Sequence, residues 1–157
     1  MKLKLFLILI ICVFAACQPD KSGGSGAADA DPEVAITGSN SDFLVKLTSS
    51  MSAESSNPGD AVTGVVIDPV PLRGGRVKGT IQRADRSFLN FTFDSVSFEG
   101  KIYPFKSRVT GVVSSKGNAG QDDFGQRIRL VGGGIIAYGT TTAINEGAEI
   151  YFIAWEE

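Results

Sequence analysis

The side chains that could carry out chemistry in this 157-residue chain are mostly carboxylates. The sequence has no histidine and two cysteines, Cys12 and Cys17. A histidine-based catalytic triad, a histidine-ligated zinc or haem and a four-cysteine zinc site are therefore excluded. Ser114, Ser115 and Lys116 are adjacent, not at the Ser-x-x-Lys spacing of a serine–lysine pair, so they do not form a nucleophile with its base.

Seven acids beside turns and strand ends could supply the two neighbouring carboxylates of a glycosidase. They are Asp85, Asp94, Glu99, Asp122, Asp123, Glu146 and Glu149. Nothing in their spacing selects a pair, so we expect solvated carboxylates. The stretch 118–123 has oxygen ligands for calcium but lacks the alternating acidic order of a calcium loop, and an ordinary polar loop is favoured. The sequence thus predicts no enzyme, no metal and no cofactor.

The N-terminus has the pattern of an export signal. Two lysines precede an uncharged apolar run of 12 residues, Leu5–Ala16, which is shorter than the ~20 residues of a membrane-spanning helix. The run ends in Phe14-Ala15-Ala16-Cys17, which resembles a bacterial lipobox, with Phe14 where the family usually has Leu. The resemblance implies that residues 1–16 are a signal peptide and that Cys17 is acylated. An ordinary secretory signal or an apolar N-terminal anchor is the alternative.

An acylated Cys17 would make the lipid bilayer a partner, since two or three acyl chains hold a protein stably on a membrane. The next residue is Gln18, not Asp. In the common sorting pattern this favours the outer membrane, facing the periplasm, in a Gram-negative organism; otherwise the expected place is the outer face of the plasma membrane. Residues 17–41 are predicted to be the lipidated cysteine and a flexible linker, because Gln18–Pro32 contains no large apolar residue.

Residues 42–157 are predicted to form one all-β domain, a small β-barrel or β-sandwich of about seven short strands. Strands are expected at 43–48, 61–67, 76–83, 87–98, 101–114 and 149–155, with short strands at 127–131 and 135–138. Gly132–Gly139 is left open between strand, helix and loop. Pro104 predicts that the strand at 101–114 lies at the edge of the sheet or contains a bulge. The last strand lacks polar alternation, so we expect it to be central and covered on both faces.

Alternation also predicts which side chains share a face of each strand. The expected apolar sets are Phe43, Val45 and Leu47; Leu89, Phe91 and Phe93; and Tyr103, Phe105, Val109 and Val113.

The order of turns and strands suggests a family. Gly75–Ile81 is followed by Ser87–Val96, Gly100–Phe105, Asp122–Gly125 and Glu146–Phe152. This order resembles a miniature of the TrbI-type β-barrel domain of type IV secretion and conjugation scaffolds, and equally resembles small envelope modules with the same strand–turn–strand pattern. The chain lacks that family's inner-membrane helix, proline-rich linker and pore-forming helical pair. The resemblance therefore implies an envelope scaffold without catalytic residues.

Charge is unevenly distributed along the chain. From Val70 to Lys116 there are nine basic residues and three acids. Alternation places Arg76 and Lys78 on one face of a strand, and Lys106 and Arg108 on one face of another. If the strands at 76–83, 87–98 and 101–114 are neighbours, these four residues, here called the basic strip, flank Asn90, Thr92 and Asp94. The strip could meet an anionic envelope polymer or an envelope protein, or it could be a solvated sheet face that discourages aggregation.

The sequence therefore favours a membrane-anchored envelope lipoprotein with a non-catalytic β-barrel that binds or scaffolds. The alternatives are an accessory subunit of a secretion or conjugation complex, and a cell-wall enzyme that depends on carboxylates. Removal of residues 1–16 lowers the basic count from 15 to 13 against 17 acids, so the net charge moves from −2 to −4. This balance predicts no nucleic-acid partner.

Overall fold

The computed structural model describes residues 41–139 and 141–156. The predicted signal peptide, Cys17 and the linker up to residue 40 lie outside the described residues. Within them, the chain is all-β apart from one short 3-10 helix, η1 (Val70–Leu72). The strands are β1 (Ser41–Leu47), β2 (Met51–Ser52), β3 (Ala61–Asp68), β4 (Arg76–Asp85), β5 (Phe88–Phe98), β6 (Lys101–Pro104), β7 (Lys106–Val113), β8 (Ile128–Val131), β9 (Gly134–Ala137), β10 (Ala143–Ile144) and β11 (Glu149–Trp155).

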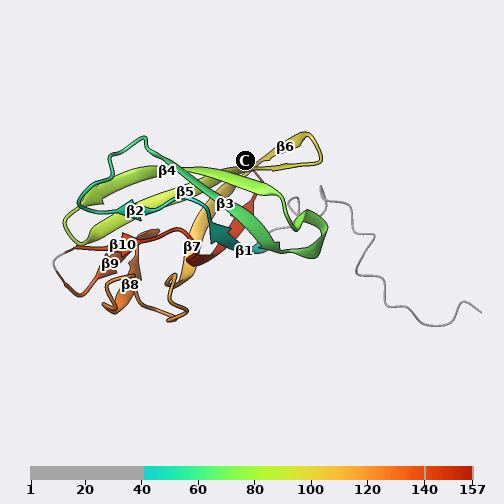
Figure 1. Cartoon of the computed structure of the whole chain (residues 1–157). Helices are drawn as coiled ribbons and strands as arrows, with labels where there is room; N and C mark the ends of the chain where they lie inside the picture. The colour runs from blue at the N-terminus through green and yellow to red at the C-terminus, as the bar shows by residue number, and fades with distance from the viewer. Residues whose placement is uncertain (1–40, 140, 157) are drawn as a thin grey trace, which may run out of the picture.

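One antiparallel sheet curls into a nearly closed barrel (Figure 1). Its strand order is β7-β11-β1-β3-β4-β5-β9-β8, and β6 pairs with β5. β2 and β10 form a separate two-stranded sheet. The prediction of a small all-β barrel or sandwich is confirmed, and the structure is the barrel. From β11 through β1, β3 and β4 to β5, here called the continuous wall, each strand pairs with the next, with register shifts in the β1–β3 and β4–β5 pairs.

The core contains stacked phenylalanines from different strands. The ring of Phe152 on β11 lies 4.9 Å from Phe43 on β1, 4.8 Å from Phe93 on β5 and 5.9 Å from Phe105, between ring centroids. The predicted inward sets of β1 and of the first half of β5 are buried as expected. Alternation thus identified the core wherever a strand runs without a bulge.

The two ends of the sheet meet along a seam where the backbone ladder stops. One edge of β7 pairs with β11 through a backbone ladder. The other edge of β7 lies beside β5, where there is no continuous ladder. Ser107 replaces that ladder: the N–H of Phe93 donates to its hydroxyl oxygen at 2.8 Å, and the hydroxyl donates to the carbonyl of Phe93 at 2.7 Å. The N–H of Phe105 donates to the carbonyl of Asp94 at 3.0 Å. β5 and β7 are therefore joined by a side chain where the strands do not pair.

The prediction of a single strand at 101–114 is wrong in two respects. It is divided at Phe105 into β6, which pairs with β5, and β7, which pairs with β11. The register of β7 and β11 also shifts between Tyr151 and Phe152. The extra residue of a bulge changes which side chains face inward, so Val112 is buried where the sequence predicted Val113.

Other differences concern the chain ends and loops. β11 is central, between β7 and β1, but it is not covered on both faces: Tyr151 points outward and is 42% exposed. A closed sheet has only one interior, so apolar residues remain on its outer face. The segment 132–139, left open by the sequence, contains β9 and the two-residue turn Gly132-Gly133, which joins it to β8. Both glycines have positive φ, as a tight hairpin turn requires.

Candidate functional site

Polar residues form an outward row along β5, and the basic strip lies on the strands that flank it. Arg76 and Lys78 are on β4, where they pair in register with Ser97 and Ser95. Lys106 and Arg108 are on β7, next to β5 across the seam. All four basic side chains are exposed. β4 and β5 are antiparallel neighbours, as the sequence required for the strip. The third expected strand is divided, however: β6 pairs with β5, whereas Lys106 and Arg108 lie on β7, which pairs with β11.

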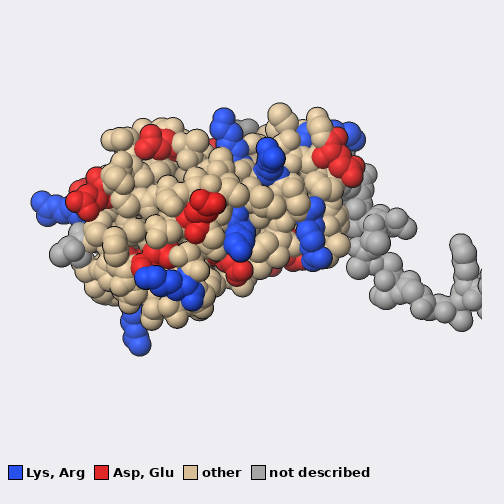
Figure 2. Space-filling view, viewed as in Figure 1, with Lys and Arg blue, Asp and Glu red and all other residues tan. Residues whose placement is uncertain are grey.

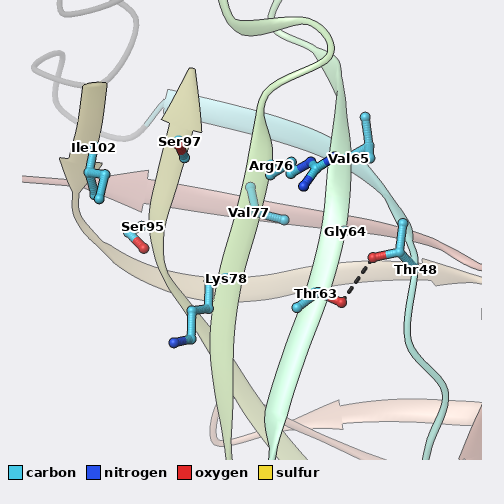
Figure 3. Close-up of a pocket in the computed structure, with 10 residues that line it drawn as sticks. All are labelled: Thr48, Thr63, Gly64, Val65, Arg76, Val77, Lys78, Ser95, Ser97 and Ile102. Carbon is cyan, nitrogen blue, oxygen red and sulfur yellow. Dashed lines mark hydrogen bonds between the residues drawn. The ribbon is translucent and has the colours of Figure 1, made fainter. Parts of the chain in front are cut away.

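The β4 half of the basic strip lines an open groove of about 520 Å³. Hydroxyl groups surround it, from Thr48, Thr63, Ser95 and Ser97, with the 71% exposed Ile102 on β6. Figure 3 shows that Arg76 extends toward β3 whereas Lys78 extends toward β5. The two cations of this half therefore point apart and do not converge on one ligand atom.

Of the β7 half, Arg108 lies at a second hollow, of about 590 Å³, beside the seam, and Lys106 is not among the residues that line it. Arg108 lines it together with Asn90 and Thr92 of β5 and Trp155 of β11. The turn Gly132-Gly133 closes one side without side chains. Charged, amide, hydroxyl and aromatic groups thus come together here from β5, β7, β11 and the β8–β9 turn.

Several polar groups of this hollow are not used within the fold. In the described part of the chain, the Arg108 guanidinium, the Asn90 amide and the indole N–H of Trp155 have no hydrogen-bond partner. Thr92 differs, because its hydroxyl donates to Asp94 at 2.9 Å and accepts from Gln82 at 3.2 Å. The first three groups are free to bind a ligand that offers matching hydrogen-bonding atoms.

The sequence did not single out Trp155 or Asn90 as ligand-contacting residues. Alternation along the last strand places Trp155 on the same face as the exposed Tyr151, which is the signal that could have found it. Asn90 was predicted between the basic residues. The hollow itself depends on the place where the barrel fails to close, which alternation within single strands does not encode.

Two acids predicted to be solvated are instead buried. Asp122 is 1% exposed and Asp123 is 4% exposed. One carboxylate oxygen of Asp122 accepts from the N–H groups of Phe124 at 3.0 Å and Gln126 at 2.8 Å, and the other accepts from the Gln126 amide at 3.1 Å. This carboxylate therefore shapes the turn that follows it, because buried charge is tolerated where several donors meet it.

Asp123 connects three segments of the chain. Its carboxylate accepts from the N–H and the hydroxyl of Ser115, and from the N–H of Asn145 at 2.6 Å. Lys116 donates to the Asp123 carbonyl at 2.8 Å. Within residues 41–139 and 141–156, no three His, Cys, Asp or Glu side chains are grouped as metal ligands. The oxygens considered for calcium are thus partly occupied by donors of the protein itself.

The other acids of the predicted set lie nearer the surface. Asp94 is exposed and accepts from the hydroxyls of Thr80 at 3.1 Å and Thr92. Asp85 is 3.3 Å from Arg83, in the one ion pair found among the described residues. On the face shown in Figure 2, acidic and basic side chains are interspersed. None of these acids is placed opposite another in a hollow described above.

Comparisons with family models, curated protein sequences and solved structures give no match. In the part of the chain that the structure describes, no helix has the length and hydropathy of a membrane span.

Proposed function

We propose that this protein is a lipid-anchored cell-envelope protein whose β-barrel binds an anionic envelope component and catalyses no reaction. The observation that carries the proposal is Cys17, which follows two alanines at the end of an apolar run. Acyl chains on Cys17 would anchor the protein, and residues 18–40 would connect the anchor to the barrel. The membrane face is the outer membrane, toward the periplasm, in a Gram-negative organism.

The roles of the buried acids support binding over catalysis. Asp122 and Asp123 are the described acids in the most buried positions, and both carboxylates accept hydrogen bonds from loop backbone groups. A glycosidase instead needs one carboxyl group that can give up a proton and a second that faces the same sugar. The arrangement of these two acids is that of turn-forming acceptors.

The basic strip supports an anionic ligand. Arg76, Lys78 and Arg108 are exposed and form no ion pair with another described residue. Unpaired cations on one outer region attract anionic material even when the net charge of the protein is negative. Membership of a secretion or conjugation complex stays a prediction.

The anchor is tested by metabolic labelling with radioactive palmitate. The unmodified chain is expected to incorporate label and to partition into the detergent phase, because two or three acyl chains hold a protein on a membrane. Cys17→Ala should abolish both, whereas Cys12→Ala, a matched change within the predicted signal, should leave the labelling of the mature protein unchanged. Absence of label in the unmodified chain would refute the proposed function.

A further inference from the structure

We propose that the hollow beside the seam is a binding site for an acidic saccharide. This inference rests on the proposed function and names the ligand class of the barrel. Its elements are the exposed Arg108, the half-buried Trp155 and Asn90, and the side-chain-free turn Gly132-Gly133, around a volume of about 590 Å³. That volume is within the range of ~300–1,000 Å³ typical of small-molecule sites.

The charge of the hollow fits one carboxylate. Arg108 is the charged residue among those that line it, and its guanidinium has no ion-pair partner within the described residues. A guanidinium binds a carboxylate through two parallel hydrogen bonds. Phosphate groups carry more charge and are usually held by several cations or by a nest of backbone N–H groups. One arginine therefore favours a carboxylate over a phosphate.

The neutral groups fit the rest of a sugar. Asn90 offers both a donor and an acceptor, the hydroxyl of Thr110 offers both as well, and the indole N–H of Trp155 offers a donor. Sugar hydroxyls need such mixed partners. One face of a pyranose ring carries C–H groups that pack against an aromatic ring, and Trp155 supplies an aromatic ring at this hollow.

The position of the hollow suits a chain of sugars. It lies on the outer face of the barrel, where β5, β7 and β11 meet the β8–β9 turn. Leu130, Val131 and the two glycines of the turn line the hollow on the β8–β9 side. The β4 groove is a poorer candidate, because Arg76 and Lys78 point apart there (Figure 3).

The experiment uses the single tryptophan of the chain as its probe. The full chain, purified in detergent, is titrated with a β-1,4-linked glucuronic acid trimer and with cellotriose, the neutral trimer of the same linkage. The acidic trimer is expected to give a saturable change in tryptophan emission, since Trp155 lines the hollow. Cellotriose should bind at least about ten-fold more weakly, because it lacks the carboxylates that Arg108 would bind.

Two arginine variants separate the site from general charge attraction. Arg108→Gln should weaken binding of the acidic trimer by at least about ten-fold, while Arg108→Lys keeps the charge and should recover part of the affinity. Arg86→Gln is the matched control, because it removes an exposed arginine that lies outside both the basic strip and this hollow. It should leave the affinity unchanged. Circular dichroism of each variant checks that the barrel is folded.

Three results would overturn the inference. One is no change of emission with the acidic trimer, and another is equal weakening by Arg108→Gln and Arg86→Gln, which would indicate general attraction. The third is displacement of the trimer by an equal concentration of inorganic phosphate, which would reassign the hollow to a phosphate group. Palmitate labelling of Cys17 is independent of all three, so failure of this site is distinguishable from failure of the anchor.

Discussion

The two sides of the barrel are held together by different interactions. From β11 through β1, β3 and β4 to β5, neighbouring strands pair through backbone ladders, and Phe43, Phe93 and Phe152 pack behind them. Along the seam and the loop at 114–127 the ladders stop, and buried polar side chains take their place. These side chains are Ser107, Ser114, Asp122 and Asp123, and the buried Thr142 has a similar part where it joins β9 to Ser87, just before β5.

Each of these polar groups accepts or donates where a strand partner is missing. Ser107 bonds both backbone groups of Phe93, and Thr142 accepts from the N–H of Ala137 at 3.2 Å and donates to the carbonyl of Ser87. A buried backbone group without a partner is costly, so an open barrel needs substitutes. The comparison teaches that this barrel uses apolar packing where its sheet is continuous and side-chain hydrogen bonds where it is not.

The largest expected effect is in the aromatic core behind the continuous wall. Phe152→Ala should lower the free energy of unfolding by about 3–5 kcal/mol, because it removes a ring that contacts Phe43, Phe93 and Phe105 and leaves a cavity. Urea unfolding followed by circular dichroism measures the change. Tyr151→Ala is the control, since Tyr151 is the neighbouring aromatic residue on the outer face. Equal losses for both variants would contradict the placement of Phe152 at the core.

A smaller effect is expected where a buried carboxylate organises the loop. Asp122→Asn replaces one acceptor oxygen by an NH₂ group, which must then face one of the N–H donors that bind Asp122. We expect the free energy of unfolding to fall by about 2–3 kcal/mol. The substitution leaves a buried N–H donor without an acceptor and also removes the charge that strengthened the remaining hydrogen bonds. The same urea experiment measures it.

Asp94→Asn is the matched control for that substitution. Asp94 accepts from the hydroxyls of Thr80 and Thr92, which can rotate and accept from an amide instead. Its loss should be within about 0.5 kcal/mol, as is usual for surface positions. A comparable loss in both variants would show that the burial of Asp122 has no special part in stability.

Alternation was sufficient for β1 and the first half of β5 and insufficient for the seam. Phe43, Phe91 and Phe93 were predicted to face inward, because period-2 patterns record which face of a strand is buried. The split at Phe105 and the shift to Val112 were not predicted, since a bulge changes the face without changing the composition. Pro104 marked the region of the split but not the exchange of strand partners.

The candidate site was predicted in part. Arg76, Lys78, Lys106 and Arg108 were placed on the outside by alternation, and they are exposed. The division of the basic strip between two hollows depends on barrel curvature and on the seam, which are properties of several strands together. The burial of Asp122 and Asp123 depends on donors as distant as Asn145, and no local pattern indicates such a partner.

The smallest expected effect is at the seam itself. Ser107→Ala removes the hydroxyl that joins β7 to Phe93 and should cost about 1–2 kcal/mol in the free energy of unfolding, since both backbone groups of Phe93 lose their partner. Hydrogen exchange gives the sharper measurement: the Phe93 amide should exchange faster in the variant, while amides of the β3–β4 ladder should not change.

Ser95→Ala is the control for the seam. Ser95 is on β5, the strand of Phe93, but it lines the outer groove and does not bond Phe93. It should leave exchange at Phe93 unchanged. If Ser107→Ala instead accelerates exchange equally in the β3–β4 ladder, the barrel opens as one unit, and the distinction between the seam and the continuous wall fails. If exchange rises at Phe93 alone, the barrel opens first where a single hydroxyl stands in for a strand.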